Sequence, residues 1–156
     1  MKRLLLAAAA ACALAAPTVT TAAAHASPAP DVQQLVSPLR FTYIQYDSPG
    51  SDNGSNASIN AEFVTIYNPS SIARPLTGFR VHDLQSHFYR FGTFQLGPHK
   101  SVRLHTGKGT NTATNRYWGQ GYYVWNNTGD SAFLVSAGGD RVDFCHWGDG
   151  PGSIHC

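Results

Sequence analysis

Oxygen-bearing side chains gather in one short segment, residues 47–62. They are the carboxylates and amides of Asp47, Asp52, Asn53, Asn56, Asn60 and Glu62. Calcium takes about six to eight oxygen ligands from carboxylates, amides and carbonyls in a flexible loop. The segment has these atoms but lacks the spacing of an EF-hand. One hypothesis is therefore a calcium site made by Asp47, Asp52, Asn56, Asn60 and Glu62.

A second interpretation of the same segment needs no metal, and we favour it. Glu62 shares a strand face with Val64 and Ile66, so its side chain is expected to point inward. A buried carboxylate must be satisfied by N–H groups or by an ion. The segment is then an Asx-rich turn in which Glu62 is hydrogen-bonded to backbone.

Aromatic side chains are the second group that could bind a ligand. The connection 106–121 is polar and Gly-rich. Unstructured loops longer than about 12–15 residues, as this one is, are often functional. A ligand surface for sugar rings or a protein partner would use Tyr117, Trp118, Tyr122 and Trp125. The favoured alternative is that the connection folds down and Trp118 completes the core.

Catalytic constellations are not evident. The chain has no H-E-x-x-H zinc motif and no G-x-S-x-G nucleophile motif. Glu62 is the only glutamate, and no second carboxylate is indicated for glycosidase chemistry. His82 and His105 lie on the polar faces of their expected strands, as ordinary surface histidines do. We predict no enzyme activity, and no cofactor besides the calcium of the first hypothesis.

The first 26 residues have the pattern of a secretory signal peptide. Lys2 and Arg3 precede an apolar run that ends at Ala16, and small residues follow. Cleavage is expected after Ala26 or Ala24. The run is shorter than the roughly 20 residues of a membrane span. We therefore expect a secreted, extracellular chain without a membrane span.

Cys145 and Cys156 are the cysteines that remain after this cleavage. Outside the cytosol, a lone pair most simply forms a disulfide, which would pin the C-terminal tail 149–156 to the last strand. The alternative is zinc bound by these cysteines with His146 and His155. Because neighbouring strand residues point to opposite faces, Cys145 and His146 do not easily share one ion, and the disulfide is favoured.

The composition predicts a folded domain with little charge. Charged residues make up 13% of the chain, about half the usual share, and aromatic residues make up 12%. Disordered chains have few aromatics and much charge. Without Lys2 and Arg3, the basic and acidic residues are equal in number, so the mature chain has no general attraction for nucleic acid. We predict no nucleic-acid partner.

Short apolar-alternating runs separated by turn residues predict seven or eight strands. A flexible leader, 27–35, precedes them. The expected strands are 39–46, 62–67, 78–82, 88–91, 101–105, 122–125, 132–135 and 141–147. No window has the period and caps of an amphipathic helix. The pattern is typical of an all-β sandwich of two antiparallel sheets or of a barrel.

Several motifs resemble those of the lamin tail domain family. They are 60–68 (NAEFVTIYN), 78–83 (GFRVHD), 124–134 (VWNNTGDSAFL) and 139–143 (GDRVD). The resemblance covers about residues 36–148 and is greatest to small secreted bacterial members. The Ala-rich leader suits an actinomycete-like source. The resemblance implies an immunoglobulin-like β-sandwich, no enzyme activity and a binding or structural role outside the cell.

The turn motif within 124–134 also has a physical explanation without a ligand. Asn126, Asn127 and Gly129 tolerate positive φ, and Asp130 can accept hydrogen bonds from the N–H groups of the turn. With Trp125, we interpret this motif as structural.

The sequence thus favours a secreted, non-enzymatic binding or structural module at the bacterial cell exterior. The alternative is a calcium-dependent carbohydrate- or cell-wall-binding module. The expected partner is an unidentified protein or wall polymer, and no oligomeric state is predicted.

Overall fold

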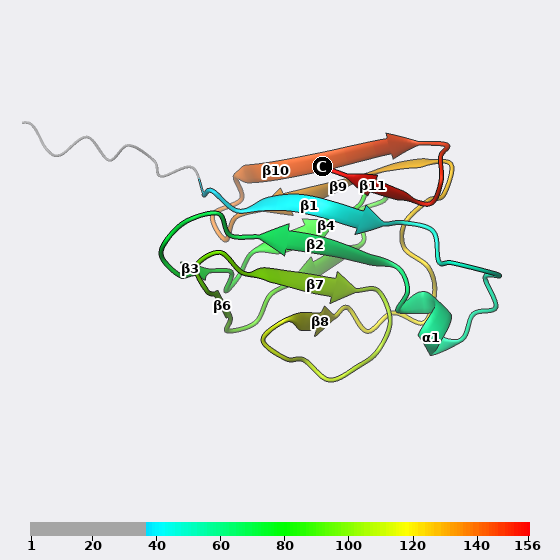
Figure 1. Cartoon of the computed structure of the whole chain (residues 1–156), viewed down its shortest axis with the longest axis horizontal. Helices are drawn as coiled ribbons and strands as arrows, with labels where there is room; N and C mark the ends of the chain where they lie inside the picture. The colour runs from blue at the N-terminus through cyan, green and yellow to red at the C-terminus, as the bar shows by residue number, and fades with distance from the viewer. Residues whose placement is uncertain (1–36) are drawn as a thin grey trace, which may run out of the picture. The chain divides into compact units, whose positions relative to one another are not determined.

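Two stacked β-sheets make up the part of the chain that the computed structural model describes, residues 37–156 (Figure 1). The predicted signal peptide and leader lie outside the described residues. The first sheet has the strand order β11-β1-β2-β7-β8. Its strands are β1 (Arg40–Gln45), β2 (Phe63–Tyr67), β7 (Ser101–His105), β8 (Asn115–Tyr117) and β11 (Ser153–His155).

The second sheet has four strands in the order β10-β9-β4-β5. Its strands are β4 (Arg80–His82), β5 (Phe88–Arg90), β9 (Gly129–Val135) and β10 (Arg141–Gly148). A small separate pair joins β3 (Arg74–Pro75) to β6 (Gln95–Leu96). This pair and the one-turn helix α1 (Asn56–Ile59) lie at opposite ends of the sheets (Figure 1).

The core lies between the two sheets and follows the alternation of the strands. Val64 and Ile66 of β2, Val81 of β4 and Leu134 of β9 are completely buried. Their neighbours along each strand point to the outer faces, because successive strand residues alternate between the two faces of a sheet. The predicted all-β, immunoglobulin-like sandwich is therefore confirmed.

One expected strand is wrong. Residues 122–125 are not in a sheet, and both Val124 and Trp125 are buried instead of alternating. The N–H of Val124 donates to Oε2 of Glu62 at 3.0 Å. The backbone N–H of Val124 is therefore satisfied by a side-chain carboxyl group and not by a neighbouring strand.

Several short elements were not predicted. Strand β8 lies inside the long connection 106–121 and pairs in parallel with β7. Helix α1 lies inside the Asp/Asn segment, where the side chain of Ser55 caps it by accepting from the N–H of Ser58. These elements are too short to show a periodic pattern, and their tertiary contacts stabilise them.

The predicted disulfide between Cys145 and Cys156 is present, with a Cα–Cα distance of 5.8 Å. The tail before Cys156 forms β11, which pairs with β1 of the first sheet, whereas Cys145 lies on β10 of the second sheet. The bond therefore links the two sheets at one edge. Beside it, the N–H of Phe41 on β1 donates to Asp143 on β10 at 2.7 Å.

Removal of this link is expected to weaken the sandwich measurably. A disulfide that closes so short a loop contributes about 3 kcal/mol. The Cys145→Ser/Cys156→Ser double variant should therefore unfold about 10 °C lower in a circular dichroism melt. Reductant should lower the melting temperature of the native chain and leave that of the variant unchanged. An unchanged melt after complete reduction would contradict the structural role.

Candidate functional site

Glu62, directly before β2, is a buried carboxyl group with only 1% of its surface exposed. Besides the bond from Val124 to its side chain, its backbone carbonyl accepts from the N–H of Thr106 at 3.1 Å. Burial raises the pKa of Glu62 to about 8, although the hydrogen bond from the N–H of Val124 counteracts part of the shift. Glu62 therefore holds the start of the connection 106–121 at Thr106, and the chain just after its end at Val124. With this pKa the Glu62 side chain is mostly protonated at neutral pH.

The other predicted calcium ligands occupy different surroundings. The side-chain amides of Asn56 and Asn60 both donate to the carbonyl of Lys108, at 2.9 and 2.8 Å. Asp47 lies against Gly152 in the C-terminal tail, and Asp52 is exposed. Among residues 37–156, no three His, Cys, Asp or Glu side chains form a group that could hold a metal. The contacts fit a hydrogen-bonded turn, and calcium binding stays a prediction.

The predicted aromatic ligand surface is mostly folded into the protein. Trp125 is 3% exposed, and Trp118 packs edge-on against it with ring centroids 5.9 Å apart. Tyr117 stacks on His105 at 5.1 Å. Tyr122 alone among the four remains exposed as a large side chain. The four residues therefore do not form one exposed platform, because the long connection folds onto the core through Trp118.

Asp130 joins the turn motif to the rest of the second sheet. It is 2% exposed and accepts from the N–H groups of Asn126, Ser131 and Leu84, at 3.1, 2.7 and 3.2 Å. The turn also receives a bond from the indole of Trp147 to the carbonyl of Asn126. These contacts agree with a structural role for the motif.

One detail of the predicted turn is corrected. Gly129 has φ of +148°, but Asn126 and Asn127 do not have positive φ, since the positive-φ non-glycine residues of the described chain are Ser86 and His99. Asn126 is instead held by the carboxylate of Asp130.

The most exposed ring surface lies on the outer face of the second sheet, where the sequence assigned no site. Four ring-bearing residues are paired across neighbouring strands of this sheet: Phe88 on β5, His82 on β4, Phe133 on β9 and Phe144 on β10. We call these four residues the aromatic row. Phe88 is 62% exposed and Phe144 is 48% exposed. Only the register between strands brings the row together, so spacing along the sequence could not reveal it.

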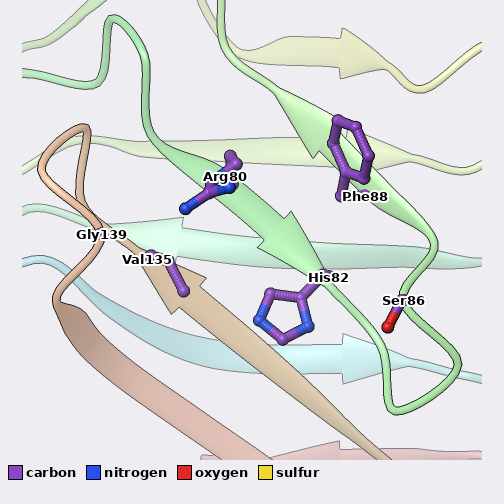
Figure 2. Close-up of a pocket in the computed structure, with 6 residues that line it drawn as sticks. All are labelled: Arg80, His82, Ser86, Phe88, Val135 and Gly139. Atoms are coloured by element: carbon purple, nitrogen blue, oxygen red, sulfur yellow. The ribbon is translucent and has the colours of Figure 1, made fainter.

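A pocket of about 310 Å³ adjoins the aromatic row. It is lined by Arg80, His82, Ser86, Phe88, Val135 and Gly139. Figure 2 shows the side chains of Arg80, His82 and Phe88 around this pocket. The pocket therefore combines cationic, imidazole and aromatic groups on a surface open to a ligand.

The two stacked sheets define an immunoglobulin-like β-sandwich, and the pocket lies on the outer face of one of them. The model of the Lamin Tail Domain family matches residues 33–149, and the chain belongs to this family. No curated protein matches the chain. Within the described residues, the structure has no helix long and apolar enough to cross a membrane.

The buried carboxyl of Glu62 is expected to make stability fall as the pH rises. Its pKa is about 8 in the folded protein against 4.5 without burial, so between these values only the unfolded chain releases the proton. Stability should therefore fall between pH 5 and 8, by up to about 1.4 kcal/mol per pH unit. The Glu62→Gln variant should lose this slope and exceed the native chain in stability above pH 8, as measured by urea unfolding.

A second variant separates charge from the hydrogen bond. Glu62→Ala leaves the N–H of Val124 without its acceptor and, like Glu62→Gln, has no carboxyl group to titrate. It should therefore be less stable than Glu62→Gln by about 1–3 kcal/mol at every pH. Equal pH slopes for the native chain and Glu62→Gln would contradict the assignment.

The carboxylate of Asp130 is expected to contribute strongly to stability. Asp130→Ala leaves the N–H groups of Leu84, Asn126 and Ser131 without this acceptor, which should cost about 3 kcal/mol in urea unfolding. Replacement of the exposed Asp149 by Ala is the matched control and should change stability by less than about 0.5 kcal/mol. Equal effects of the two substitutions would show that Asp130 has no such role.

Proposed function

We propose that this lamin tail domain protein is a secreted, non-enzymatic module that binds a macromolecule at the bacterial cell exterior. The observation that carries the proposal is the disulfide between Cys145 and Cys156, which links the two sheets. Structural disulfides form and persist in oxidising compartments, and they are rare in the cytosol. The signal-peptide pattern of residues 1–26 agrees with this location.

The absence of catalysis is supported by how the buried acids are used. Glu62 and Asp130 accept hydrogen bonds from backbone N–H groups, and Asp83 accepts from the N–H and the ring of His87. These contacts account for the three carboxyl groups that are buried among the described residues. Turnover of a glycan, peptide or ester by the pure protein would overturn this part of the proposal.

A binding role is supported by exposed apolar side chains on one face. Phe88 and Phe144 lie on the same outer face, and the exposed Leu84 follows β4 on the connection to β5. Contiguous exposed apolar surface often marks an interaction site. The module therefore offers a surface to a partner without any need for a catalytic group.

The proposal is tested by production of residues 1–156 in a secreting bacterium. We expect the chain in the culture medium with its disulfide formed and with Ser27 or His25 as its first residue, as determined by mass spectrometry. A variant without residues 1–26 is the control and should remain in the cells. Retention of the uncleaved native chain in the cells would contradict secretion.

The binding part of the proposal is tested with isolated cell envelopes. The purified chain should sediment with envelopes to the same extent in calcium and in chelator. Release by chelator would favour the calcium-dependent alternative, and no sedimentation in either condition would contradict envelope binding.

A further inference from the structure

We propose that the outer face of the four-stranded sheet binds an acidic polysaccharide, with sugar rings on the aromatic row and acid groups on three adjacent arginines. This inference rests on the proposed function as a binding module, and it adds the surface and the chemical class of the partner. Its evidence is the cross-strand register, the exposure of the rings and the placement of positive charge.

The aromatic row offers apolar ring edges to a sugar, because the faces of its stacked rings are turned toward one another. The ring centroids of His82 and Phe133 are 4.8 Å apart, and those of Phe133 and Phe144 are 6.4 Å apart, with nearly parallel planes. His146, two residues farther along β10, lies beside Phe144 with ring centroids 6.0 Å apart. Since neighbouring strands are about 4.8 Å apart, the row crosses the sheet as a nearly continuous band. Such a band suits a chain of linked rings better than a single small molecule.

A row of positive charge runs beside the aromatic row. A second set of residues is paired across the same four strands, next to the aromatic row along each strand. It consists of Arg90 on β5, Arg80 on β4, Val135 on β9 and Arg141 on β10. The guanidinium of Arg141 lies over the ring of Phe144, 5.1 Å from its centroid. Charge and ring surface therefore lie side by side on three of the four strands, β5, β4 and β10.

These guanidinium groups are available to an external acid. The side chains of Arg80, Arg90 and Arg141 are all exposed to solvent. Arginine binds carboxylates through two parallel hydrogen bonds. The pocket lined by Arg80, His82 and Phe88 lies where the two rows meet (Figure 2), so one sugar unit can contact both.

The outer face of the five-stranded sheet serves as an internal comparison. It also has an aromatic series, from His155 and Tyr43 through Phe63 to His105 and Tyr117. His155 at the end of this series is exposed, but its other four rings are half-buried, and none of them is among the exposed large hydrophobic side chains of the described residues. Both ring nitrogens of His105 are hydrogen-bonded, to Asn60 and Asn115. The four-stranded sheet is therefore the face that remains open to a partner.

Charge also favours an acidic polysaccharide over a second copy of this chain and over nucleic acid. A symmetric pair of chains joined through this face would bring the arginines of both copies together, and like charges repel. Nucleic-acid-binding domains are usually strongly basic, whereas this chain has equal numbers of basic and acidic residues after residue 26. A local row of three arginines on a neutral domain matches a partner with spaced acid groups.

The test is titration of the purified chain with polygalacturonate, and with its fully methyl-esterified form as the uncharged control. We expect the acidic polymer to bind at least about 10-fold more tightly than the ester, and added salt to weaken it. Arg80→Ala/Arg90→Ala and Phe88→Ala should each lower the affinity by about 10-fold. Arg103→Ala, which removes an arginine above Phe63 on the other sheet, should leave the affinity unchanged. Thermal melts should show that all variants remain folded.

Three results would overturn the inference: equal affinity for the two polymers, tighter binding of oligothymidylate, or no binding of polygalacturonate. Envelope sedimentation distinguishes failure of this polysaccharide site from failure of the proposed envelope-binding function. If the Arg80→Ala/Arg90→Ala variant still sediments fully, the module binds envelopes through another surface. If the native chain does not sediment, envelope binding fails, and the polygalacturonate titration still decides the role of this face.

Discussion

The buried carboxyl of Glu62 is the constraint on which the arrangement of the long connection depends. An unsatisfied carboxyl group in the core is costly, so the chain must bring a donor to it. That donor is the N–H of Val124, while Thr106 bonds to the backbone carbonyl of Glu62. The start of the connection 106–121 and the chain just after its end are therefore attached to one residue. As a result Trp118 and Trp125 pack against the core instead of facing solvent.

The two sheets are held together by different means at their edges and centre. Completely buried aliphatic side chains such as Ile66 and Leu134 fill the space between the sheets. At one edge the disulfide from Cys145 to Cys156 and the added strand β11 attach the tail to both layers. The strand alternation that directs Val81 and Leu134 inward also directs His82 and Phe133 outward. Core formation and the composition of the outer face are thus consequences of the same strand geometry.

The outer face of the four-stranded sheet shows how a surface arises without a sequence motif. Phe88, His82, Phe133 and Phe144 are far apart along the chain, and each belongs to a different strand. The antiparallel register places them in line and places Arg90, Arg80 and Arg141 beside them. In the long connection, by contrast, aromatic residues that are close in sequence have separate roles. Trp125 is in the core, whereas Tyr122 is exposed and packs beside His87.

The sequence by itself determined the all-β class, most strand positions and the pairing of the two cysteines. These properties depend on local alternation, on turn residues and on the small number of cysteines, all of which can be read along the chain. The inward direction of Glu62 was also predictable from its position beside Val64 and Ile66. Only the tertiary structure decided that Val124 is its donor, that Asn56 and Asn60 hold Lys108, and that four strands align a row of rings. The physical reason is that each of these contacts joins residues distant in sequence, so it depends on strand register and packing and not on local spacing.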